Sequence, residues 1–182
     1  MNAFSFLITT LFDLYLMVVI LRMWLQLARA DFYNPFSQFI VKATHPVLAP
    51  MRRVFPSLGG FDTASFVLAL LVVVAKVVLL SLMAGAGIDI VTILLFALVS
   101  VVKQAGVLLF WMLLIRAILS WFNQGYNPIV MVMGQLTEPV LAPIRRIIPP
   151  MGGLDLSVMV LIIGLNFLNM LLAQYVPFWA MI

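Results

Sequence analysis

The sequence predicts an all-α integral membrane protein with two parallel repeats, four transmembrane helices and amphipathic helices at the cytoplasmic interface. The first observation is the charge content: of 182 residues, 10 are Lys or Arg and 6 are Asp or Glu. A soluble domain of this length would carry about 45 charged residues. The second is that 65% of the residues are hydrophobic, more than a core of this size can bury. The third is an internal duplication.

Four apolar runs are long enough to cross about 30 Å of hydrocarbon, which takes roughly 20 helical residues. We expect transmembrane spans at residues 4–27, 64–83, 98–122 and 156–176. Residues 87–97 form an extra apolar segment, which we expect to pack at the outer side. The apolar stretch continues from residue 88 to residue 122, so two alternatives remain: one long helix, or a broken or re-entrant pair.

The distribution of basic residues predicts the orientation. The N-terminal tail, the second connection and the C-terminal tail contain no Lys or Arg, whereas the first and third connections contain Arg29, Lys42, Arg52, Arg53, Arg145 and Arg146. The positive-inside rule therefore places both long connections in the cytoplasm and both termini outside.

Residues 44–62 are repeated as residues 137–155, with 12 identities in 19 positions. The two segments read THPVLAPMRRVFPSLGGFD and TEPVLAPIRRIIPPMGGLD. Each half then consists of a span, a cytoplasmic connection and a second span, and an even number of crossings makes the repeats parallel. We expect repeat 1 at residues 1–86 and repeat 2 at residues 98–182.

Each connection begins with an Asn-Pro pair, which is a helix-start signal. Apolar residues follow at helical spacing, so we expect interfacial amphipathic helices at residues 35–45 and 128–138. Glycine pairs then supply turns, and an aspartate is placed to cap the next span. These turn and cap residues are Gly59, Gly60, Asp62, Gly152, Gly153 and Asp155.

The doubled pattern P-x-x-x-P-x-R-R-x-x-P-x-x-G-G-x-D, at residues 46–62 and 139–155, resembles the YggT family (YlmG-related). With the preceding Asn-Pro pairs, the similarity covers nearly the whole chain. It implies a multi-pass protein of the bacterial inner (plasma) membrane or of plastids. It also implies either a role in osmotic-stress tolerance and potassium or ion homeostasis, or a role in membrane-protein assembly or division.

The adjacent arginines of the two connections are candidates for headgroup or partner binding: Arg52, Arg53, Arg145 and Arg146. Neighbouring helical side chains point about 100° apart, so one of each pair can lie along the apolar face while the other reaches solvent. The arginines either set topology and contact anionic headgroups, or the pseudo-symmetry brings them together as a phosphate or partner-docking site.

Ionisable residues inside spans are energetically costly, so each needs a partner or a purpose. Asp13 and Lys76 lie at similar depth in neighbouring spans, where they can pair. The repeat alignment adds polar residues at this level and predicts an intramembrane polar cluster of Asp13, Lys76, Lys103, Gln104, Asn166 and Asn169. The cluster either holds the helices together or forms a polar pathway at the repeat interface.

The alignment also relates two other pairs of positions. Arg22 and Arg116 match near the inner ends of their spans, where we expect them to anchor the helices by reaching the interface. His45 stands where the second repeat has Glu138. We therefore expect this position to need a polar residue beside a proline rather than an imidazole.

The sequence contains no Cys and one His, which excludes disulfides and argues against a metal site. It shows no catalytic triad, paired catalytic carboxylates, P-loop or dinucleotide fingerprint. We therefore expect no enzymatic activity and no cofactor. Nucleic-acid binding has no support beyond the net charge of +4. The expected partners are the lipid bilayer with its anionic headgroups, and either another membrane protein or a second copy of the chain.

Overall fold

The computed structural model describes residues 2–87, 89–122, 127–148 and 155–182. Over these residues the regular elements are helices: α1 (Ala3–Leu27), α2 (Pro35–Met51), α3 (Thr63–Ala84), α4 (Ile90–Phe122), α5 (Pro128–Ile147), α6 (Leu156–Tyr175) and the short 3₁₀ helix η1 (Trp179–Met181). Four of them, α1, α3, α4 and α6, are long and apolar enough to cross a membrane. The prediction of an all-α membrane protein with four spans is confirmed.

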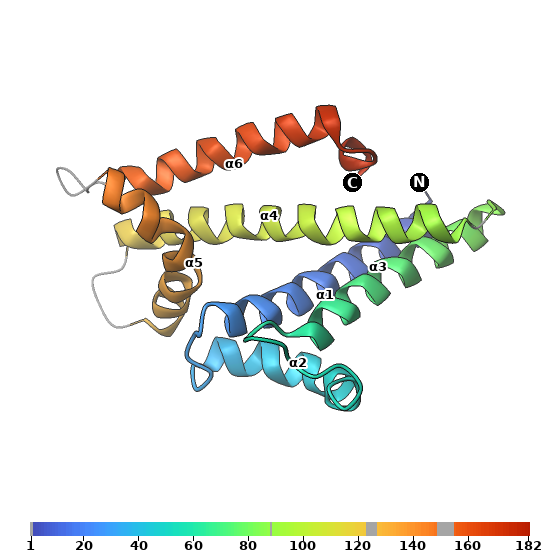
Figure 1. The fold of residues 1–182 in the computed structure, drawn as a ribbon, viewed down its shortest axis with the longest axis horizontal. Coiled ribbons are helices and arrows are strands. Elements are labelled where there is room, and N and C mark those ends of the chain that lie inside the picture. Colours follow the sequence, from blue (N-terminus) through green and yellow to red (C-terminus); the bar gives the residue numbers. More distant parts are fainter. Residues whose placement is uncertain (1, 88, 123–126, 149–154) are drawn as a thin grey trace.

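The long helix α4 lies at the centre of the molecule, with α1 and α3 on one side and α6 on the other (Figure 1). Both termini lie toward one end of the long helices, and α2 and α5 lie toward the other. The shorter helix α2 packs on α1 and α3, and α5 packs on α4 and α6. The order of long helix, short helix and long helix therefore occurs twice, with both short helices at the same end.

The helix starts follow from local capping. The Asn34 side chain accepts a hydrogen bond from Phe36 N at 3.0 Å, and the Asn127 side chain accepts one from Ile129 N at 2.9 Å. A proline occupies the first turn of both helices, where no amide donor is needed. The prediction of a helix start at each Asn-Pro pair is confirmed.

Both short helices, α2 and α5, continue beyond the bounds that the sequence predicts. α2 contains Pro46 and Pro50, and α5 contains Pro139 and Pro143, within helical geometry. Each proline removes one backbone hydrogen bond. Burial of the inward face offsets these losses: Leu48 in α2 and its counterpart Leu141 in α5 are almost fully buried. The prolines therefore lie inside the helices instead of ending them.

The helix α4 is continuous through Lys103 and Gly106, so the broken or re-entrant alternative is wrong. The expectation of a separate apolar segment at residues 87–97 is also wrong, because residues from Ile90 onward belong to α4. The physical reason is that no proline interrupts this run, while Asp89 accepts a hydrogen bond from Thr92 N at 3.0 Å where the helix begins. At 1.5 Å per residue, 33 residues give a helix of roughly 50 Å.

Three hydrogen bonds join the repeats at the end that carries α2 and α5. Asn34 Nδ2 donates to Pro128 O at 2.7 Å, and Trp24 Nε1 donates to Leu136 O at 2.9 Å. The third runs from the backbone of Asp31 to the side chain of Gln135, at 2.9 Å. Since these groups come from opposite repeats, they fix α5 against the end of α1 and the start of α2.

The two capping asparagines form a matched pair for a stability test. Asn34→Ala removes both a helix cap and the contact with Pro128 in the other repeat, whereas Asn127→Ala removes a cap alone. We expect Asn127→Ala to cost about 1 kcal/mol and Asn34→Ala about 1 kcal/mol more, because a partly buried hydrogen bond is also lost. Thermal unfolding of both variants in the same detergent measures the difference. Equal losses would contradict the assigned inter-repeat contact.

Candidate functional site

An ion pair connects the end of α2 to the start of α3 in the first repeat. Arg52 Nη2 lies 2.5 Å from Asp62 Oδ2, and the Asp62 side chain is fully buried. Asp62 also accepts hydrogen bonds from the Ser65 amide at 3.2 Å and the Ser65 hydroxyl at 2.7 Å. One carboxylate therefore caps α3 and anchors α2.

The environment keeps Asp62 ionised. Burial acts to raise the pKa of this carboxyl, but hydrogen bonds from Ser65 and Arg52 outweigh it, and the pKa is lowered from its ordinary value. A buried carboxylate without these donors would instead take up a proton. Asp62 therefore stays ionised because Ser65 and Arg52 donate hydrogen bonds to it.

A glycine turn brings Asp62 back toward Arg52. Leu58 and Phe61 exchange backbone hydrogen bonds of 3.1 and 2.9 Å across the turn. Gly59 and Gly60 between them have φ angles of +57° and +91°, a region that disfavours side-chain-bearing residues. The corresponding Gly152 and Gly153 lie outside the described residues.

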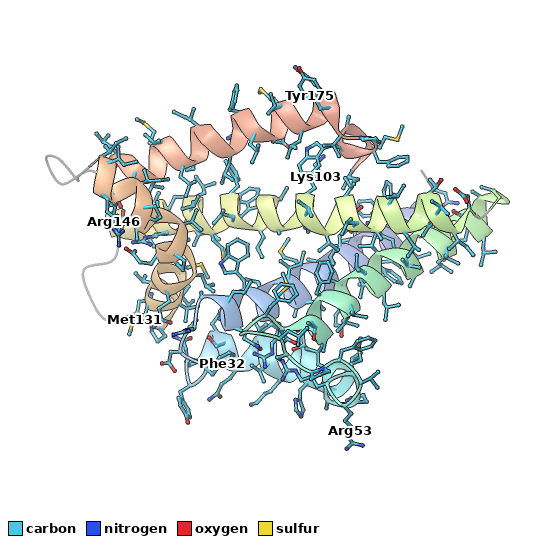
Figure 2. All side chains as sticks on the ribbon, viewed as in Figure 1. Phe32, Arg53, Lys103, Met131, Arg146 and Tyr175 are labelled. Atoms are coloured by element: carbon cyan, nitrogen blue, oxygen red, sulfur yellow. The ribbon has the colours of Figure 1, made fainter. Side chains whose placement is uncertain are left out.

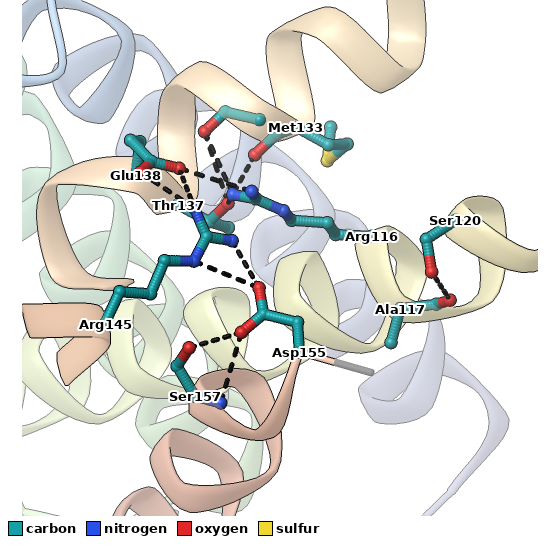
Figure 3. A network of polar contacts seen from close by, with 10 residues as sticks. Arg116, Ala117, Ser120, Met133, Thr137, Glu138, Arg145, Asp155 and Ser157 are labelled. Atoms are coloured by element: carbon teal, nitrogen blue, oxygen red, sulfur yellow. Dashed lines mark hydrogen bonds and ion pairs between the residues drawn. The ribbon is translucent and has the colours of Figure 1, made fainter. Parts of the chain in front are cut away.

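The second repeat contains the equivalent ion pair, shown in Figure 3. Arg145 Nε donates to Asp155 Oδ2 at 3.1 Å, and Arg145 Nη2 binds the same oxygen. The Ser157 amide donates to Asp155 Oδ1 at 3.2 Å, which caps α6. Burial acts to raise the pKa of Asp155, and Arg145 and Ser157 more than offset it, so the pKa is lowered. The carboxylate of Asp155 raises the pKa of Arg145 in turn.

Glu138 extends this network to α4. Its carboxylate accepts hydrogen bonds from Arg145 Nη1 at 2.9 and 3.0 Å and lies 3.2 Å from Arg116 Nη2. Arg116 also donates to the Thr137 hydroxyl and to Gly134 O. Figure 3 shows both guanidiniums directed at the same carboxylate. Two arginines and two carboxylates thus join the ends of α4, α5 and α6.

The matched arginines Arg22 and Arg116 both contact other groups of the protein. Arg116 is held by α5, as described above, and Arg22 is only 8% exposed, with its guanidinium 5.0 Å from the centre of the Phe32 ring. Arg22 therefore packs inside the protein, and the expectation that it anchors α1 at the membrane interface stays a prediction. Phe32 belongs to the loop between α1 and α2, and this loop and α2 pack against the end of α1.

Arg53 and Arg146, the second members of the arginine pairs, are exposed. Within the described chain neither makes a side-chain hydrogen bond or an ion pair. Figure 2 shows Arg53 projecting away from the end of α2 and Arg146 beside α5, in separate parts of the molecule. The four arginines therefore do not form one site: each repeat uses one arginine internally and presents the other outward.

The polar residues inside the spans divide into two groups. In the first repeat, Lys76 Nζ lies 2.6 Å from Asp13 Oδ1, so α3 and α1 are joined by an ion pair within the membrane-spanning region. Lys76 is the less exposed partner, at 12% against 39% for Asp13. The pair neutralises the two charges that were hardest to place in hydrocarbon.

In the second repeat, Lys103 is held by the C-terminal segment. Lys103 Nζ donates to Trp179 O at 2.7 Å, and the indole Nε1 of Trp179 donates to Asn169 Oδ1 at 2.9 Å. Asn166 instead donates to Ile162 O in its own helix. Figure 2 shows Lys103 between α4 and α6. These side chains line a cavity of about 360 Å³ whose walls are otherwise apolar.

The single polar cluster expected from the alignment is therefore two separate centres. In the described chain no hydrogen bond or ion pair links Asp13 or Lys76 to Lys103, and the Gln104 side chain makes none. The sequence did not indicate Trp179 as the partner of Lys103, because the acceptor is a backbone carbonyl, which every residue carries. The bridging role of Glu138 was also not predicted. The mismatch between Glu138 and His45 in the alignment was the available signal.

Among the described residues, no group of three or more His, Cys, Asp or Glu side chains is placed to hold a metal ion. Several polar side chains act on each other: Arg52 and Arg145 bind aspartates, these aspartates cap helices, and Lys76 and Lys103 each have an acceptor. The arrangement defines a multi-pass α-helical membrane protein with a repeated arginine–aspartate joint at one end.

Comparison with known proteins identifies the family. A model of the CCB3/YggT family matches residues 1–83 and 95–176. The chain belongs to this family, in agreement with the resemblance seen in the repeated motif. No solved structure matches the chain.

Similar proteins occur in bacteria and in a plant. A Vibrio alginolyticus protein named "Uncharacterized protein in proC 3'region" is 61% identical over 182 residues, covering 98% of both chains. The Escherichia coli K12 protein "Uncharacterized protein YggT" is 44% identical over 178 residues, 96% of this chain and 91% of that one. The Arabidopsis thaliana protein "YlmG homolog protein 2, chloroplastic" is 41% identical over 54 residues, 30% of this chain and 22% of that one.

The lowered pKa of Asp62 predicts how stability depends on pH. Because the folded-state pKa lies below the unfolded value, the stabilisation is complete above the range in which free Asp titrates, about 3.9, and is lost as the pH falls through the folded-state pKa. We expect Asp62→Asn to destabilise the protein by about 1–3 kcal/mol at neutral pH and to lose less stability than wild type on acidification.

Unfolding midpoints measured from neutral pH down to about pH 3 test this expectation. Asp31→Asn is the matched control, because Asp31 is exposed and, among the described residues, its carboxylate accepts a hydrogen bond only from the nearby backbone amide of Tyr33. That variant should keep the wild-type acid dependence. An unchanged acid slope in Asp62→Asn would show that the ion pair does not contribute as assigned.

Proposed function

We propose that this protein is a non-enzymatic membrane scaffold that supports osmotic-stress tolerance and potassium or ion homeostasis by docking another membrane protein. The cellular role is drawn from the family resemblance. The molecular role is supported by the architecture of α2 and α5. The same face would serve the family's other implied role, in membrane-protein assembly or division.

The main support is the repeated arginine–aspartate joint. It fixes α2 and α5 to the spans that follow them, so both helices are held as a rigid surface at one end of the molecule. Large apolar side chains are exposed on or beside these helices, including Phe39, Val54 and Ile147. Arg53 and Arg146 are exposed next to them. A partner with an apolar face and acidic residues would complement this surface.

Ion conduction through the chain itself has less support. A conducting path needs a continuous polar lining, whereas Asp13 is paired with Lys76 and Lys103 is bound by the Trp179 carbonyl. The cavity beside Lys103 has mostly apolar walls. These features suit a protein that influences ion balance through a partner.

The proposed orientation places α2 and α5 in the cytoplasm and both termini outside. The basic residues beside these helices support it. A reporter that is active only outside the cytoplasm is expected to be active when fused to either terminus. A reporter that is active only inside the cytoplasm is expected to be inactive at both positions. A cytoplasmic signal from either fusion would reverse the orientation and move the docking surface to the other side.

Complementation separates a docking role from a transport role. In cells that lack the protein, we expect the variant Arg53→Glu/Arg146→Glu to lose growth after osmotic shock and under potassium limitation. The same variant should no longer co-purify a stoichiometric membrane partner, because its charge opposes an acidic surface. Arg53→Lys/Arg146→Lys should retain both, since it keeps the charge.

Two further measurements complete the test. Asp13→Leu/Lys76→Met removes both members of the intramembrane pair and should retain growth if no ion uses them. Purified wild-type protein in liposomes should carry no potassium flux. A flux that Lys103→Met abolishes, or full growth and partner recovery with the glutamate variant, would refute the docking role.

A further inference from the structure

The two repeats differ at one position of the arginine network. In repeat 2, the carboxylate of Glu138 receives hydrogen bonds from Arg145 and lies 3.2 Å from Arg116 Nη2. With Asp155, two carboxylates face two guanidiniums, so the charges of this group balance. The side chain of Glu138 is therefore the bridge between the end of α4 and the end of α5.

Repeat 1 keeps both arginines but lacks this bridge. Arg22 and Arg52 correspond to Arg116 and Arg145, and Asp62 corresponds to Asp155. The position of Glu138 is taken by His45, which is exposed and forms no hydrogen bond or ion pair in the part of the chain that is described. Two guanidiniums thus share one carboxylate, which leaves an excess charge of +1.

Besides the excess charge, repeat 1 has guanidinium nitrogens that donate no hydrogen bond to the described residues. Arg22 Nη1 and Arg52 Nε are buried and have no hydrogen-bond partner among the described residues. Arg22 is more than nine-tenths buried, and the charges of Arg22 and Arg52 are close enough to repel each other. A buried charged donor without an acceptor destabilises the folded state.

The neighbours of Arg22 contact its guanidinium but leave Nη1 without a hydrogen-bond acceptor among the described residues. The Phe32 ring, 5.0 Å from the guanidinium carbon, offers a cation–π contact but no hydrogen-bond acceptor. Thr44, the counterpart of Thr137, donates its hydroxyl to Ile40 O, and no bond to Arg22 is present among the described residues. These donors of Arg22 and Arg52 therefore lack acceptors among the described residues, and the oxygens of an external oxyanion would supply them.

We propose that repeat 1 binds an anionic phospholipid through its phosphate, which takes the place between Arg22 and Arg52 that the Glu138 carboxylate takes in repeat 2. Guanidinium donors match the oxygens of a phosphate. The Arg52 side chain is 32% exposed, so this residue can be reached from the surface of the protein. The site lies where α2 meets the end of α1, the depth at which an interfacial helix meets lipid headgroups.

This site does not depend on the proposed docking function, because it needs only the two arginines and a bilayer. Its ligand chemistry is that of an oxyanion, which a lipid headgroup or free phosphate can supply. The anionic lipid is favoured because the site adjoins the membrane interface and Phe32, beside it, exposes 39% of its surface to contact acyl chains.

The variant His45→Glu tests the proposal by restoring the missing carboxylate. Purified protein is placed in phosphatidylcholine nanodiscs with or without phosphatidylglycerol, and its melting temperature is measured. Wild type should melt several degrees higher with phosphatidylglycerol. His45→Glu should melt higher than wild type in phosphatidylcholine alone and should lose the response to phosphatidylglycerol, because its own carboxylate fills the site.

Gln38→Glu is the matched control, since it adds one negative charge at an exposed position of the same helix. It should keep the wild-type lipid response. Glu138→His should gain a second lipid-dependent increase, because it removes the built-in carboxylate of repeat 2. Neither substitution alters a buried position, so both variants should fold.

Addition of inorganic phosphate to phosphatidylcholine nanodiscs distinguishes the ligand sources. Stabilisation by phosphatidylglycerol alone, lost in His45→Glu, supports the lipid headgroup. Equal stabilisation by inorganic phosphate, also lost in His45→Glu, supports the oxyanion site but overturns its assignment to lipid. If neither stabilises wild type, or if His45→Glu responds as wild type does, the site itself is overturned.

Discussion

The architecture depends on one interaction, the ion pair between the arginine near the end of each short helix and the aspartate that caps the next span. Arg52 with Asp62 and Arg145 with Asp155 join helices that run in different directions at the membrane interface. A carboxylate can remain charged there only with several donors, and the serine and arginine supply them. Each short helix is thereby fixed to its repeat, and the short helices of both repeats meet at one end of the molecule.

The two repeats use the same joint with different surroundings. In repeat 1, the ion pair of Asp13 with Lys76 joins α1 to α3, and six residues of α3 are buried. Repeat 2 is more open: α6 buries only Ser157 and Val158, and the cavity beside Lys103 separates it from α4. The arginine networks show the reverse difference. In repeat 2, Arg116 and Arg145 bind carboxylates of the same repeat. In repeat 1, one donor each of Arg22 and Arg52 lacks an acceptor among the described residues. The two halves therefore differ in their polar sites.

Sequence patterns were sufficient wherever the determining interaction is local or set by the solvent. The four spans follow from hydrophobic length, and the helix starts from Asn-Pro capping. Prediction was incomplete where packing outweighs local preference: Pro46 and Pro139 lie inside helices because the buried faces of α2 and α5 continue past them. The polar cluster was predicted from matched depth, which does not specify the direction in which a side chain points. Lys103 instead meets a backbone carbonyl of the C-terminal turn.

The sequence by itself determined that the chain is a membrane protein, that it is duplicated, and that arginines, glycines and aspartates recur at fixed spacing. These properties follow from composition and periodicity, which need no knowledge of distant contacts. Only the tertiary structure decided which arginine of each pair is bound, that Arg22 is enclosed, and that Glu138 joins two arginines while His45 joins none. The reason is that hydrogen bonds across helices depend on how the helices pack, and packing brings together residues far apart in the chain.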